Sequence, residues 1–167
     1  MKFKFLTVAA AALLLAACST TPEQTAATEG TGATTSTTAV APTSTVTPGS
    51  LQDFTQNVGD RVFFGFDRYD LTPEAQATLQ KQAAWLKAYP QVTVVIEGHA
   101  DERGTREYNL ALGERRAAAV ANYLVALGID ANRIQTISYG KERPAVEGHD
   151  ETAWAQNRRG VTVPNVQ

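Results

Sequence analysis

The segment VTVVIEGHADERGTREYNLALGERRAAAVANYLVALG, residues 92–128, decides the fold because a strand pattern gives way to a helix pattern within it. Its first five residues are all β-branched, which is typical of a strand. From residue 108 to residue 127, apolar side chains recur at helical spacing. The side chains that share one face of this helix are Ala117, Val120, Leu124 and Leu127. Gly128 is suited to end the helix, so the segment predicts a strand, a polar loop and an amphipathic helix.

The same alternation of patterns extends on both sides of this segment. Upstream, residues 61–66 predict a strand, and Thr72 followed by Pro73 predicts a helix that stops before Pro90. The elements predicted downstream are a strand over residues 133–139, a short helix over residues 151–158 and a last strand over residues 161–163. We therefore predict an α+β domain over residues 59–167, with helices packed on a βαβαβ-type sheet.

The start of the chain has the pattern of a bacterial lipoprotein leader. Two lysines precede an apolar run over residues 5–17, which is too short to span a membrane comfortably. The run ends in LAAC, which resembles a lipobox, and Cys18 is the only cysteine of the chain. We therefore predict a signal peptide over residues 1–17 and a lipid-modified Cys18, with Ser19 favouring sorting to the outer membrane. In a plain signal peptide cleaved nearby, Cys18 would be incidental.

Residues 18–58 are expected to form a disordered linker behind this lipid anchor. Threonine, alanine, serine and proline dominate the stretch, and large apolar side chains are few. Such a composition cannot bury enough surface to offset the entropy of ordering the chain. A flexible tether lets a domain reach a target at a variable distance from its own membrane. The formal net charge of −2 argues against nucleic acid as a partner, because phosphates require a basic surface.

Polar side chains gather where the predicted strands end, which is where ligands favour binding in sheets of this kind. Asp67 follows the first strand directly, and Asp101 follows the second. Asn109, Leu112 and Arg116 share one face of the following helix and lead back to the Asp101 loop. An acid and a guanidinium together suit a zwitterion. Asp101 would hold an ammonium group, and Arg116 with the free amides of the helix start would hold a carboxylate.

Each of these side chains also has a purely structural interpretation. Asp101 could cap the turn that follows it, Arg116 could be a solvated helix residue, and Asp67 could simply end a strand. Of Arg158 and Arg159, one could be a salt-bridge partner within the core while the other faces the ligand, and the sequence leaves open which is which.

Several motifs, in order along the chain, resemble the OmpA-like peptidoglycan-binding domain. They are GFDRY at residues 65–69, EGHADERGT at 97–105, YN at 108–109, LGERRA at 112–117, SYGK at 138–141, Pro144, GHD at 148–150 and NRR at 157–159. Together with the lipobox, they are most similar to the lipid-anchored members of that family that belong to the Tol–Pal system. The resemblance covers roughly residues 61–163.

The resemblance implies both a fold and a function. The fold is a mixed sheet with helices on one side. The function is non-covalent, non-enzymatic binding of peptidoglycan, without a cofactor or a metal, in which Asp101 and Arg116 hold the meso-diaminopimelate end of the stem peptide. The other residues implied to line the groove are Phe66, Asp67, Asn109, Leu112 and Arg158 or Arg159. The implied partners are TolB, on a surface overlapping the groove, and TolA. The implied role is to tether the outer membrane to the wall, maintaining envelope integrity and constriction during cell division.

The sequence departs from the family pattern at two positions. Gly160 stands where the family has alanine or valine, and Pro164 is expected to end the last strand.

Two other functions are compatible with the sequence. The domain could be a periplasmic adaptor that binds proteins without binding the wall. It could also be a zinc peptidase with His99, Asp101 and His149 as ligands, although two histidines at helical spacing are lacking.

Overall fold

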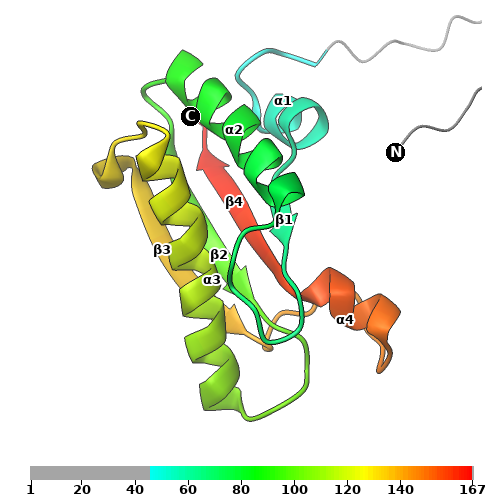
Figure 1. Cartoon of the computed structure of the whole chain (residues 1–167). Helices are drawn as coiled ribbons and strands as arrows, with labels where there is room; N and C mark the ends of the chain where they lie inside the picture. Colours follow the sequence, from blue (N-terminus) through cyan, green and yellow to red (C-terminus); the bar gives the residue numbers. More distant parts are fainter. Residues whose placement is uncertain (1–45, 167) are drawn as a thin grey trace, which may run out of the picture. The chain divides into compact units, whose positions relative to one another are not determined.

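The computed structural model describes residues 46–166 (Figure 1). Its strands are β1 (Arg61–Phe63), β2 (Thr93–His99), β3 (Ile134–Gly140) and β4 (Arg159–Asn165). Its helices are α1 (Leu51–Asp53), α2 (Pro73–Ala88), α3 (Arg106–Ala126) and α4 (Glu151–Asn157), with a π-helical turn at Phe54–Val58 and a 3₁₀ turn at Ala131–Arg133. The predicted signal peptide, the lipid-modified Cys18 and most of the predicted linker lie outside the described residues.

The four strands form one mixed sheet in the order β1-β4-β2-β3. β2 and β3 run parallel, whereas β4 runs antiparallel to both of its neighbours, β1 and β2. α2 and α3 lie on one face of the sheet, and α4 precedes β4 at one end of it (Figure 1). The α+β architecture with helices packed on a mixed sheet is confirmed.

The two long helices pack as their sequences predict, and α2 begins at the predicted cap, whereas α3 begins at Arg106, two residues earlier than predicted. The side chain of Thr72 accepts a hydrogen bond from the backbone N–H of Ala75 at the start of α2, and Thr105 caps α3 in the same way. Their apolar faces meet the sheet in one core, whose fully buried members include Leu79, Leu86, Val94, Ile96, Val120 and Leu124. Of the helices described, none is long and apolar enough to cross a membrane.

A pair of glycines brings α3 unusually close to β2. A Cβ atom on Gly98 would lie 1.8 Å from the carbonyl oxygen of Gly113, so neither helix nor strand could keep its place with a side chain there. The contact lies at the end of β2 and in the first half of α3. It therefore fixes the candidate residues Asn109 and Arg116 beside the loop that carries Asp101.

The domain begins earlier than expected, so the predicted linker boundary at residue 58 is wrong. Residues 51–58 are helical, and Phe54 is completely buried against Trp85, with ring centroids 4.9 Å apart. The indole N–H of Trp85 also donates to the carboxylate of Asp53 at 2.8 Å. A single aromatic side chain in a polar stretch thus holds this segment on α2, because burying a phenylalanine contributes roughly 2 kcal/mol or more.

The last strand is longer than predicted, and Pro164 does not end it. Pro164 pairs with Val94 of β2, while β1 extends only as far as a pairing with Val161. The N–H of Thr162 points toward the β1 side, where it donates to the carbonyl of Asp60. Pro164 faces the same side two residues further on, beyond the start of β1, so its missing N–H removes no ladder hydrogen bond. The packing also explains why a glycine stands at position 160, because a Cβ atom there would lie only 3.2 Å from Cγ2 of Val120.

Candidate ligand-binding site

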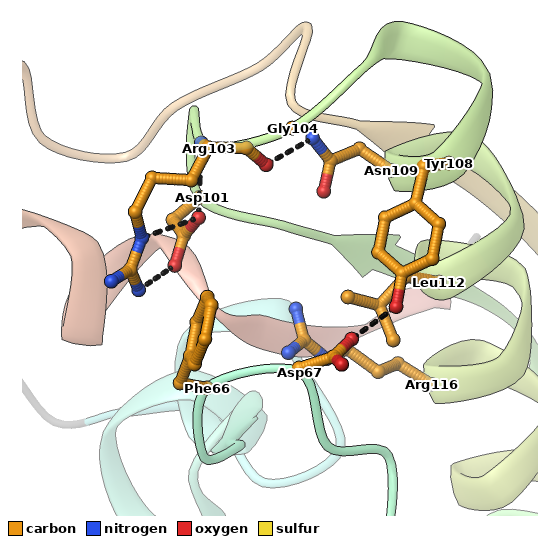
Figure 2. Close-up of a pocket in the computed structure, with 9 residues that line it drawn as sticks. All are labelled: Phe66, Asp67, Asp101, Arg103, Gly104, Tyr108, Asn109, Leu112 and Arg116. Carbon is orange, nitrogen blue, oxygen red and sulfur yellow. Dashed lines mark hydrogen bonds and ion pairs between the residues drawn. The ribbon is translucent and has the colours of Figure 1, made fainter.

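A cavity of about 190 Å³ opens at the carboxyl end of β2. It lies between the β1–α2 loop, the β2–α3 loop and the first half of α3 (Figure 2). Its lining residues are Phe66, Asp67, Asp101, Arg103, Gly104, Tyr108, Asn109, Leu112 and Arg116. The structure thus brings together six of the eight groove residues expected from the sequence.

Arg116 forms the floor of the cavity as a completely buried cation. Its three guanidinium nitrogens each donate to a backbone carbonyl, at 2.8 Å to Arg68, 2.7 Å to His99 and 3.1 Å to Gly65. No carboxylate of the described residues lies within ion-pair distance of it. Burial lowers the pKa of Arg116 to about 10, against the opposing effect of the negative charge of Asp101. The interpretation of Arg116 as a solvated helix residue is therefore wrong.

Asp101 is also buried, but its carboxylate is already bonded. Arg103 donates to it from Nη2 at 2.5 Å, from Nε at 3.3 Å and from its backbone N–H at 3.1 Å. The backbone contact shows that Asp101 does cap its own turn, as its structural interpretation held. Burial acts to raise the pKa of Asp101, but the bonds from Arg103 outweigh it and hold this pKa below its ordinary value.

The opposite side of the cavity is closed by a pair of polar side chains (Figure 2). The hydroxyl of Tyr108 donates to the carboxylate of Asp67, and this bond raises the pKa of Tyr108. Asp67 has a backbone φ of 55°, in the left-handed region that non-glycine residues seldom adopt. β1 ends at Phe63, before this turn, so Asp67 does more than terminate a strand. The turn places Phe66 against Arg103 of the β2–α3 loop and Asp67 against Tyr108 of α3.

The two arginines after Asn157 take different places, and neither lines the cavity. Arg158 is buried behind Asp101, with its Nη1 3.4 Å from the carboxylate and its Nη2 2.5 Å from Glu151. Arg159 donates instead to the backbone carbonyls of Asn157 and Arg143. Arg158 therefore supports Asp101 from behind, and Arg159 lies away from the candidate site.

The three residues considered as zinc ligands are not gathered at one point. His149 bonds to Glu102 at 2.7 Å, and His99 is buried beside Glu97 at 3.3 Å. The carboxylate of Asp101 is bonded to Arg103 and Arg158. Over residues 46–166, no group of three potential metal-ligating side chains comes together.

Sequence reasoning missed three residues of the cavity, namely Arg103, Gly104 and Tyr108. Arg103 stands two positions after Asp101. At this spacing a long arginine side chain in a tight loop can fold back, so that its guanidinium meets the carboxylate. Tyr108 directly precedes Asn109, but the partner it reaches, Asp67, lies 41 positions away in the sequence. Only the folded structure shows that contact.

Comparisons with known proteins agree with the motifs. The model of the OmpA family matches residues 63–158. The peptidoglycan-associated lipoprotein of Brucella melitensis is 61% identical over 119 residues, which are 71% of this chain and 71% of that protein. The protein of the same name from Haemophilus influenzae is 53% identical over 112 residues, 67% of this chain and 72% of that protein.

Solved structures give the same result. The crystal structure of the peptidoglycan-associated lipoprotein from Burkholderia pseudomallei matches with a TM-score of 0.66 and 43% identity, covering 70% of this chain and all of that one. The resemblance inferred from the motifs is confirmed, and the chain belongs to the OmpA family.

Proposed function

We propose that this protein binds peptidoglycan without cleaving it, by gripping the diaminopimelate end of a stem peptide in the cavity above Arg116. The observation that carries the proposal is the buried Arg116 guanidinium, which has no ion-pair partner among the described residues. A buried charge without a counter-charge is costly, and an anion entering the cavity would compensate it. The names of the relatives, which are peptidoglycan-associated lipoproteins, support the same ligand.

The chemistry of the cavity suits a zwitterionic side chain. The free end of meso-diaminopimelate carries one ammonium and one carboxylate group. In the proposed complex the carboxylate faces Arg116, and the ammonium faces Asp101 at the other end of the cavity. Leu112 and Phe66 supply apolar walls for the methylene chain between these groups. Charge at both ends would fix the orientation of the ligand.

We further propose that a lipid on Cys18 holds the protein in the outer membrane, so that wall binding tethers that membrane to peptidoglycan. The protein would act in the Tol–Pal system, with TolB as a partner and TolA as a second one, and support envelope integrity and outer-membrane constriction during division. Three aromatic side chains of the β1–α2 loop and α3 are largely exposed. They are Phe66 (59%), Tyr69 (49%) and Tyr108 (45%). Such residues favour a protein contact, and a TolB surface that overlaps the groove would make the two partners exclusive.

Co-sedimentation with diaminopimelate-type sacculi tests the wall-binding proposal. The fragment 46–167 is compared with Asp101→Asn and with Asp70→Asn, a matched loss of charge at an exposed residue whose ion-pair partner among the described residues is Arg68. We expect the wild type and Asp70→Asn to pellet with the sacculi and Asp101→Asn to stay in solution. If all three pellet alike, the wall is bound through another site. If none pellets, the adaptor function replaces wall binding.

A further inference from the structure

The subsite that Asp101 offers to a ligand cation already contains a cation of the protein. The guanidinium of Arg103 lies against both oxygens of the Asp101 carboxylate, at 3.3 Å from Nε to Oδ1 and 2.5 Å from Nη2 to Oδ2 (Figure 2). This is the paired, planar geometry of a strong arginine–carboxylate interaction. The side chain of Arg103 remains 31% exposed, so it borders the cavity rather than the core.

Two aromatic rings hold the same guanidinium. The central carbon of the Arg103 guanidinium lies 4.0 Å from the ring centroid of Phe66 and 4.0 Å from that of Trp154. Trp154 is fixed in turn by its indole N–H, which donates to Glu102 at 2.9 Å. A carboxylate with two aromatic walls is a receptor for a cation. Residues of the β1–α2 loop, the β2–α3 loop and α4 therefore form a cation subsite around Arg103.

We infer that Arg103 is an internal occupant of this subsite, and that the ammonium group of the ligand binds by displacing it from Asp101. The inference rests on the proposed function, because it concerns how that ligand enters. It adds Phe66 and Trp154 as walls of the ammonium subsite and makes Arg103 the residue that sets the affinity for the ammonium.

The local charges favour displacement of Arg103 over addition of a third cation. Asp101 already faces Arg103 and, at 3.4 Å, the buried Arg158. Glu151 is the second carboxylate of this cluster, so an added ammonium would place three cations around two carboxylates, and like charges at such distances repel. An ammonium that replaces Arg103 leaves the number of charges around Asp101 unchanged.

The displaced side chain already has a second carboxylate within reach. Oε2 of Glu151 lies 3.9 Å from Nη2 of Arg103, while Oε1 of this 64% exposed glutamate is bonded to Arg158. The backbone carbonyl of Arg103 is held by the side-chain amide of Asn109 at 2.8 Å, so the loop itself can stay in place while the side chain turns outward. The exchange therefore requires rotation of one side chain from Asp101 to Glu151.

Because Arg103 competes with the ligand, its removal is expected to strengthen binding. The probe is the soluble tripeptide L-Ala-γ-D-Glu-meso-diaminopimelate, titrated calorimetrically into fragment 46–167, which contains every described element. We expect Arg103→Ala to bind it about tenfold more tightly than the wild type, and Arg103→Lys to fall between them, because lysine keeps the charge but not the planar pairing. A matched control is Arg106→Ala, which removes a cation that pairs with Glu142 outside the cavity, and its affinity is expected to be unchanged.

The same tripeptide with the free amine of its diaminopimelate acetylated shows which group competes with Arg103. Loss of the ammonium should abolish the gain from Arg103→Ala. Trp154 gives an independent signal, because tripeptide binding would exchange the Arg103 guanidinium beside its indole for an ammonium group and should therefore change the tryptophan emission of the wild type.

Weaker or equal binding of the amine-bearing tripeptide by a folded Arg103→Ala would overturn the inference, since Arg103 would then contact the ligand or play no part. So would a gain that persists with the acetylated probe. If the wild type and all variants ignore the tripeptide, the proposed function itself fails, and the inference fails with it.

Discussion

Replacing Arg116 by lysine should separate its structural role from its charge. The side chain is completely buried, and three different nitrogens of its guanidinium donate to the carbonyls of Gly65, Arg68 and His99. These bonds join the β1–α2 loop to the end of β2. A lysine ammonium keeps the charge but has one nitrogen, which cannot reach three carbonyls set around a planar fork.

The expected loss of stability follows from the bonds that lysine cannot replace. At least two hydrogen bonds from a charged donor would be lost, each contributing about 1.5 kcal/mol. We therefore expect Arg116→Lys to lower the free energy of unfolding by about 3 kcal/mol. For a domain of this size, this corresponds to a fall in Tm of roughly 10–20 °C.

Urea unfolding followed by circular dichroism measures this loss, with Arg115→Lys as the matched control. Arg115 is the adjacent residue and makes one bond, to the carbonyl of Ala111 in its own helix, so its replacement should change stability by less than about 0.5 kcal/mol. If Arg116→Lys unfolds at the same urea concentration as the control, Arg116 is not the structural link between these loops.

Three further predictions follow from the core. Phe54→Ala should lower the free energy of unfolding, measured in urea, by about 3–5 kcal/mol, and a fragment starting at residue 59 should lose a similar amount. Unaltered stability of both would show that residues 51–58 belong to the linker and not to the domain. Gly98→Ala should cost about 3 kcal/mol or more, because its Cβ would overlap the carbonyl oxygen of Gly113, and a Tm equal to the wild type would contradict that contact. Burial, followed by the charges of Arg159 and Arg143, lowers the pKa of His99 from 6.5 to about 4. The unfolded chain therefore binds more protons between these values, so up to about 3 kcal/mol of stability should be lost as the pH falls from 6.5 to 4. In His99→Gln this slope should flatten, and an identical pH profile would assign the slope to other groups.

The long elements could be predicted from the sequence because local signals and the core agree there. Thr72 and Pro73 mark the start of α2, and the apolar stripe of α3 faces the sheet as its spacing predicts. The segment around Phe54 could not be predicted, because its polar composition resembles a linker and the surface it covers on α2 is set by tertiary packing. β4 can continue through Pro164 because its neighbour β1 does not pair at that position. The local sequence does not predict where β1 begins.

The candidate site was predictable where it follows helical spacing and motif order. Asn109, Leu112 and Arg116 line one cavity with Asp101 because the glycine contact sets the first half of α3 against the end of β2. What the sequence does not show is how the charges are paired. Asp101 is bonded to Arg103, while Arg116 has only carbonyl partners among residues 46–166. Both pairings depend on the paths of the β1–α2 and β2–α3 loops, which the sequence does not predict.

NMR mapping of the bound tripeptide shows directly whether the cavity above Arg116 binds the stem peptide. Isotope-labelled fragment 46–167 is titrated with the diaminopimelate tripeptide, and changes in amide and arginine side-chain shifts are followed residue by residue. We expect the largest changes on Phe66, Asp67, Arg103, Asn109 and the Arg116 guanidinium, with little change on the sheet face opposite α2 and α3. Shifts that cluster away from this cavity, or no shifts at saturating tripeptide, would contradict this expectation.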